Sequence, residues 1–205
     1  MKRNFGRAIA LCLFLACSAA ATAQMGYSDS FTFLKAVRER DGVKVQELVS
    51  RPGSIVINTR ERQGEGALHI VTRDRDLSWL NFLLSRGARP DLQTAQGVTA
   101  LHLAATLGWV DGADLLLRRR ASVDLSNQRG ETALILAVQR RDMAMVRLLT
   151  TSGANPRRAD SVAGMSALDY AKQDPRGANI ARMLEAARPS APRPATPAPK
   201  AAPVL

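Results

Sequence analysis

One eight-residue segment returns along the chain at a fixed spacing, and this spacing limits the possible folds more than any other feature. The segment at 64–71 (Gly-Glu-Gly-Ala-Leu-His-Ile-Val) recurs at 97–104 and again at 130–137, each time 33 residues later. A weaker copy at 164–171 follows one residue late. Agreement at several positions with one period indicates a solenoid, in which each unit packs only on its neighbours.

Each unit contains the residues that two short antiparallel helices require. Thr99 and Thr132 stand where the first helix would begin, and a threonine hydroxyl there can accept a hydrogen bond from a backbone N–H of the first turn. Gly87 and Gly153 follow the second helix at a left-handed position, where a side chain would clash. Only 4% of the residues are aromatic, so Leu, Ala, Val and Ile must form the core, which favours closely packed helices.

The repeat resembles the ankyrin repeat, in which a β-turn and two antiparallel helices form each unit. The segment at 99–108, which begins Thr-Ala-Leu-His-Leu-Ala-Ala and ends in glycine, carries the resemblance. It implies an all-α ankyrin solenoid of about five helix–turn–helix units joined by β-turn loops, over residues 31–186. We expect the units at approximately 31–57, 58–90, 91–123, 124–157 and 158–186, with the first and last as caps.

The chain departs from the family pattern at several loop positions. Arg75 and Arg141 replace the glycine in the middle of the repeat, and Arg120 replaces the glycine that ends the second helix. Ile135 stands in place of the usual histidine, and alanine replaces the usual proline in each copy of the motif. We expect these departures to leave the fold intact and to loosen the loops locally.

The N-terminal segment has the features of a signal peptide. Basic residues precede an apolar run at 8–16, and the segment ends in Ala-Thr-Ala at 21–23, a typical cleavage site. We interpret 1–23 as a Sec signal peptide cleaved after Ala23 and expect a periplasmic protein, with a secreted protein that binds a host target as the alternative. An uncleaved membrane anchor and a lipoprotein acylated on Cys17 are further alternatives.

The C-terminal segment, 187–205, is rich in proline and alanine. Proline at this density prevents helices and sheet ladders, and the segment has little apolar surface to bury. We therefore expect a disordered tail. A structural component of the cell envelope, tethered by this tail to the cell wall or a membrane complex, is one alternative hypothesis of function.

His69 and His102 are the only histidines, so they are the first candidates for a metal site or a general base. They occupy the same position in adjacent units, and stacked helices lie about 8–10 Å apart, too far for two imidazoles to share a zinc ion. The resemblance implies that each bonds the backbone of a neighbouring turn. Both cysteines lie in 1–23, and no nucleophile, metalloprotease, P-loop or dinucleotide motif is present. We predict no enzymatic activity, no metal, no cofactor and no small-molecule substrate.

The formal net charge is +11, and +8 remains after removal of 1–23. Arginine clusters at 118–120, 140–141 and 157–158 are either a solvated outer face or a surface that selects acidic partners or anionic envelope components. Nucleic acid is a poor match, because the chain has no nucleic-acid motif and few aromatic side chains to stack on bases.

Two tryptophans occupy different positions in the repeat. Trp79 lies among leucines of a second helix, so we expect it in the core. Trp109 follows Gly108 at the start of the next second helix, where exposure is more plausible, and we expect only partial packing.

The resemblance implies that a protein partner binds the concave surface formed by the turn tips and the exposed sides of the first helices. The chemistry of these positions changes from unit to unit, while the core positions repeat. We predict that a monomer binds another protein there, with an apolar centre at Leu107 and a charged rim. The predicted positions are, in the turns, Arg62, Gln63, Glu65, Gln96, Val98, Gln128, Arg129 and Glu131, and on the first helices, Arg73, Asp74, Thr106, Leu107, Gln139 and Arg140.

Overall fold

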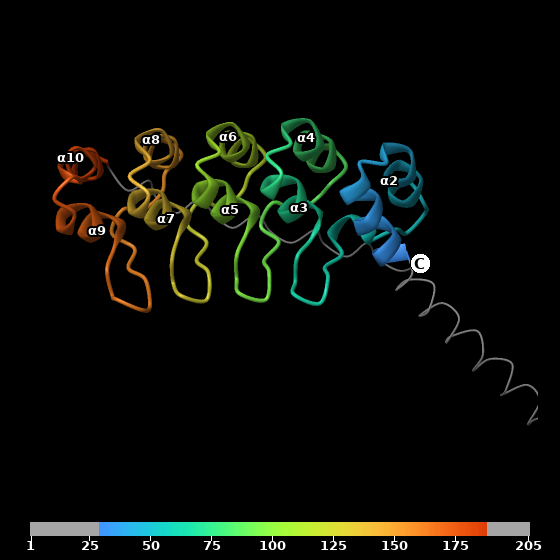
Figure 1. Cartoon of the computed structure of the whole chain (residues 1–205), viewed down its shortest axis with the longest axis horizontal. Coiled ribbons are helices and arrows are strands. Elements are labelled where there is room, and N and C mark those ends of the chain that lie inside the picture. The colour runs from blue at the N-terminus through green and yellow to red at the C-terminus, as the bar shows by residue number, and fades with distance from the viewer. Residues whose placement is uncertain (1–28, 188–205) are drawn as a thin grey trace, which may run out of the picture.

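The computed structural model describes residues 29–187, and the predicted signal peptide and most of the predicted tail lie outside them. The helices form two parallel rows (Figure 1): the first helices of the units make one row, the second helices make the other, and the turns project beyond the first row. Within the described residues, no helix is both long and apolar enough to cross a lipid bilayer.

Five helix pairs follow one another along the described part of the chain. The pairs are a helix at 29–39 with α2 (Gly42–Val49), α3 (Ala67–Arg73) with α4 (Leu77–Ser85), α5 (Ala100–Leu107) with α6 (Val110–Arg118), α7 (Ala133–Gln139) with α8 (Met143–Thr151), and α9 (Ala167–Gln173) with α10 (Ala178–Ala186). A short 3-10 helix, η1 (Val56–Asn58), follows the first pair. The predicted all-α solenoid of about five units is confirmed.

Polar side chains begin most of these helices. Thr99 and Thr132 are the N-cap residues of α5 and α7, and their hydroxyls accept from the N–H groups three residues later. Some of the second helices use aspartate instead: Asp76 caps α4 and Asp142 caps α8. Each cap satisfies a donor that the first helical turn leaves without a partner.

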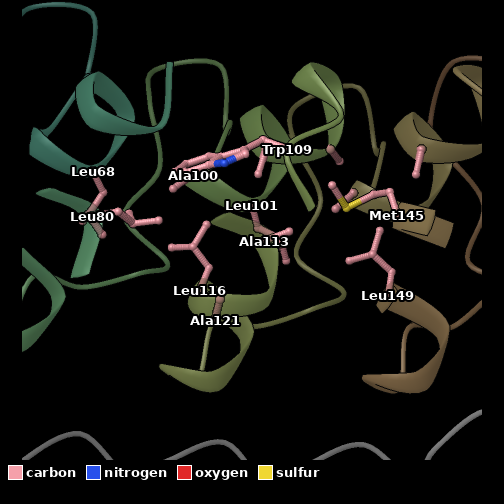
Figure 2. Packing of buried hydrophobic residues seen from close by; sticks show 14 of the residues in the cluster. Leu68, Leu80, Ala100, Leu101, Trp109, Ala113, Leu116, Ala121, Met145 and Leu149 are labelled. Atoms are coloured by element: carbon pink, nitrogen blue, oxygen red, sulfur yellow. The ribbon is translucent and has the colours of Figure 1, made fainter. Parts of the chain in front are cut away.

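The core lies between the two helix rows and is built mainly of leucine and alanine (Figure 2). Leu101 and Leu116 of the third unit and Leu149 of the fourth are almost completely buried. Such aliphatic residues allow neighbouring units to stack closely, and each unit buries apolar surface that it could not bury alone.

The two tryptophans differ from the sequence expectation. Trp109 is only 8% exposed and lies within the core cluster (Figure 2). Its indole ring packs against Gly112, which leaves no room for a side chain at that position. Trp79 is half-buried, against the ring of Phe82 and below the guanidinium of Arg40. The glycine one turn into α6 therefore makes Trp109, rather than Trp79, the more deeply buried of the two.

Backbone hydrogen bonds join each turn to the next. The N–H of Ala95 donates to the carbonyl of Gln63 over 2.9 Å, and the N–H of Gln128 donates to the carbonyl of Gln96 over 2.9 Å. The series continues from Ser161 to Arg129 over 2.8 Å. These bonds fix the position of each turn relative to its neighbour.

The turn between the two helices of a unit contains a residue with positive φ. Gly108 has the usual glycine there (φ 66°), but Arg75 and Arg141 take the same conformation at φ 54° and 58°. A left-handed conformation costs an ordinary L-residue roughly 1–2 kcal/mol. Both arginines contact the following unit: Arg75 donates to the carbonyl of Leu107, and Arg141 pairs with Asp174. The expectation of looser loops was wrong here, since these side chains tie neighbouring units together.

Candidate partner-binding face

The turns and the exposed sides of α3, α5, α7 and α9 form one side of the solenoid (Figure 1), which we call the turn face. Most of the residues predicted to bind a partner are exposed on it. The exposed residues are Arg62, Gln63, Arg73, Asp74, Gln96, Thr106, Gln128, Arg129, Gln139 and Arg140, while Glu65, Val98 and Leu107 are half-buried. Their side chains differ between units, whereas the buried residues repeat.

A hollow of about 350 Å³ lies on the turn face between the third and fourth units. It brings together six of the predicted residues: Gln96, Val98, Thr106, Gln128, Arg129 and Glu131. Leu103 and Leu136 also line it, although the sequence offered no reason to separate them from core leucines. They are 33 residues apart, and each lies three positions after the first alanine of its helix, Ala100 or Ala133. This shared offset is the only signal that could have identified them.

The second unit is not part of this hollow, and three of its predicted residues, Glu65, Arg73 and Asp74, are paired with one another or with the first unit. The guanidinium of Arg73 hydrogen-bonds both carboxylate oxygens of Glu65 and lowers the pKa of that carboxyl. Asp74 accepts from Arg40 over 2.8 Å. A partner that used these side chains would have to compete with existing ion pairs.

Glu131 departs from its predicted role. It is only 6% exposed, and its carboxylate accepts from the side-chain amide of Asn127 over 2.8 Å and lies 3.5 Å from Arg129. The carboxylate therefore supports the shape of the turn and offers little surface to a partner.

His69 and His102 are buried and bridge consecutive units. In each, Nδ1 accepts from the backbone N–H three residues earlier, that of Gly66 and of Thr99. Nε2 lies 3.0 Å from a carbonyl of the following turn, that of Val98 for His69 and of Glu131 for His102. The proton is thus on Nε2, and burial lowers the pKa of both imidazoles, which keeps them neutral.

Within residues 29–187, no three His, Cys, Asp or Glu side chains lie close enough together to hold a metal ion. The two imidazoles bond separate turns, and each has both ring nitrogens occupied by backbone groups. The described residues present a partner with exposed surface and hydrogen-bonding side chains.

A second hollow, of about 490 Å³, lies on the opposite side, between α4 and α6. It is larger, but some of its polar side chains are already paired: Asp114 binds Arg118 within α6 over 2.8 Å, and Asn81 of α4 accepts from Arg119 over 2.8 Å. It contains none of the predicted residues. We therefore regard the hollow on the turn face as the better candidate for a partner.

A family model described as ankyrin repeats (3 copies) matches residues 33–127 and 111–190. A search of curated proteins gave no match. Ankyrin repeats generally act as protein–protein interaction modules and are not catalytic. The paired helices, the projecting turns and the histidines that bridge them agree with this match, and the chain belongs to the ankyrin-repeat family.

Proposed function

We propose that this chain is exported to the bacterial periplasm and binds another protein on the turn face, the concave face of the family. The hollow between the third and fourth units supports this proposal most directly, because it unites exposed side chains of two units. The protein acts as a monomer, without a small-molecule substrate or nucleic acid. The N-terminal sequence supports export, with its basic start, apolar run and Ala-Thr-Ala site.

The rigidity of the scaffold favours binding without chemistry. The turns are joined by backbone hydrogen bonds, and histidines connect the first helices to the following turns. A face whose atoms are already in place loses little conformational entropy when a partner docks. The exposed side chains then determine which partner is selected.

The first experiment is in-cell crosslinking of the tagged protein, followed by mass spectrometry of the crosslinked proteins. Arg140→Glu tests the turn face, and Arg147→Glu is a matched control, since Arg147 is exposed on α8, the second helix of the same unit. We expect one dominant partner that is lost with Arg140→Glu and kept with Arg147→Glu. Equal loss or equal retention in the two variants would contradict binding on the turn face.

Cell fractionation and the mass of the mature N-terminus test the location. A periplasmic product that begins at Gln24 supports export and cleavage after Ala23. Protein in the medium would replace the periplasmic proposal by the secreted alternative. If deletion of 188–205 releases the protein from an envelope fraction, the tethered structural component becomes the better description.

A further inference from the structure

The hollow on the turn face has an apolar floor. Leu103 of α5 and Leu136 of α7 are equivalent residues of adjacent units, and both remain half-buried in the described structure. Val98 lies beside them, while Gln96, Thr106 and Gln128 form a polar rim. An apolar side chain placed over the two leucines would lose contact with water, which is favourable in proportion to the area covered.

Two arginines stand at opposite ends of α7, next to this floor. Arg129 lies in the turn before the helix, and its side chain is 67% exposed. Arg140 is the C-cap residue and comes four positions after Leu136, so the two lie on the same side of the helix. The Nη2 atom of Arg140 lies 3.8 Å from the point where a Cβ on Gly108 would stand, so the side chain reaches the third unit.

The acidic side chains of the fourth unit are already engaged. Asp124 accepts from the N–H of Asn155, Asp142 caps α8 at the N–H of Met145, and Glu131 is buried in its turn. Arg129 has only the 3.5 Å contact with Glu131. Arg140 has no ion pair with any residue at 29–187, although the Asp142 carboxylate also borders Gly108. Arg140 therefore lacks a close internal counterion, and Arg129, although paired with Glu131, keeps most of its side chain exposed to a partner.

We propose that the hollow binds an extended acidic peptide segment of the partner, with the pattern acidic–x–apolar–x–acidic. This inference rests on the proposed function and specifies its chemistry. Thr132 is the N-cap residue of α7 and follows the turn that carries Arg129, and from Thr132 to Arg140 the helix rises roughly 12 Å. The two acidic residues of the pattern are four positions apart, which spans about 13 Å in an extended peptide. Alternate side chains of an extended peptide point to one side, so its two carboxylates meet Arg129 and Arg140 while the central apolar side chain covers Leu103 and Leu136.

This chemistry fits a peptide better than another polyanion. A nucleic acid would supply phosphates but would need aromatic side chains on which its bases stack, and no Phe, Tyr or Trp side chain lines the hollow. An anionic membrane would attract arginines on any exposed face, including those of the second helices. The two separated arginines match the acidic side chains of such a peptide, and the apolar floor between them matches its central apolar side chain.

The test is a titration of the purified ¹⁵N-labelled protein, expressed from the full-length sequence, with the synthetic peptide Gly-Glu-Ser-Leu-Ser-Glu-Gly. We expect saturable shifts of the backbone amide signals of Gln96, Val98, Thr106 and Gln128. Arg129→Glu and Arg140→Glu should each weaken binding at least tenfold, and Arg147→Glu should leave it within twofold. Replacing both glutamates by glutamine, or the leucine by serine, should weaken binding by at least tenfold.

Several results would overturn the peptide inference. These are the absence of saturable shifts, equal binding of the glutamine peptide, or shifts centred on α4, α6 and α8. Tighter binding of polyphosphate or of anionic vesicles, lost with the same two arginines, would assign the hollow to another polyanion. A crosslinked partner that depends on Arg140, found without peptide binding, would preserve the proposed function and refute only the peptide. Peptide binding without any envelope partner would support the hollow and refute the periplasmic function.

Discussion

Thr72 provides a sharp test of how the core is stabilised. Its side chain is completely buried in α3, and its hydroxyl has no hydrogen-bond partner among the described residues. The equivalent residues of the next two units are Ala105 and Val138, both buried and apolar. The position therefore accepts a side chain without a polar atom, and we choose Thr72→Val as the perturbation because valine has nearly the same shape.

The expected magnitude follows from the missing hydrogen bond. A buried polar group without a partner costs about 1–3 kcal/mol relative to water, and Thr72→Val removes that cost without creating a cavity. We expect the free energy of unfolding to rise by about 1–2 kcal/mol. For a chain of this size, each kcal/mol raises Tm by roughly 2–4 °C.

Urea unfolding followed by circular dichroism measures this change, and Thr132→Val is the matched control. The Thr132 hydroxyl accepts from the N–H of Ile135 as the cap of α7, so the same substitution there should lower the free energy of unfolding by about 1 kcal/mol. Opposite signs in the two variants support the reasoning. A loss of stability with Thr72→Val similar to that with Thr132→Val would refute it, since the Thr72 hydroxyl would then have a stabilising partner.

Three further predictions concern stability. Burial lowers the pKa of His69 and His102 below the ordinary 6.5, so the unfolded chain binds more protons than the folded chain below that pH. The free energy of unfolding should therefore have the full contribution of the two neutral histidines above pH 6.5 and should fall below it. Equal urea midpoints at pH 7.5 and 5.5 would contradict this. Gly112→Ala should lower the free energy of unfolding by about 1–3 kcal/mol, seen as a lower urea midpoint, because the new Cβ would overlap the ring of Trp109. A higher midpoint would show that helix propensity dominates. Arg120→Gly should stabilise the protein by about 1 kcal/mol, because φ is 67° there and no carboxylate of the described residues pairs with this arginine; an unchanged thermal midpoint would argue against backbone strain.

The sequence predicted the fold well, because the repeat determines it many times over. The period of 33 residues locates the helix pairs, and Thr99 and Thr132 mark two helix starts without further information. Arg75 and Arg141 show what the period cannot reveal. Their left-handed conformation could be expected from their position, but their contacts with the next unit depend on side-chain directions in three dimensions.

The binding face was only partly predictable from the sequence. A match by repeat position identifies turn residues such as Gln96 and Gln128, but it cannot distinguish an exposed carboxylate from a buried one. Glu131 is buried, and Asn127, four residues earlier in the same turn, donates to its carboxylate. Leu103 and Leu136 occupy repeat positions that the sequence does not distinguish from core leucines, but both are half-buried and line the hollow.

The backbone hydrogen bonds between adjacent turns limit how the turn face can change in evolution. A Cβ on Gly64 would stand 2.5 Å from the N of Ala95, and one on Gly97 would stand 2.9 Å from the N of Gln128, so the peptide backbones of adjacent turns are in direct contact. The distance between adjacent turns is therefore the thickness of a peptide chain, and no choice of exposed side chain alters it. Equivalent positions of successive units are repeated along the turn face at a constant spacing. Duplication or loss of one unit would move every later contact by a whole step, so a partner could follow such a change only by gaining or losing a whole segment of its own.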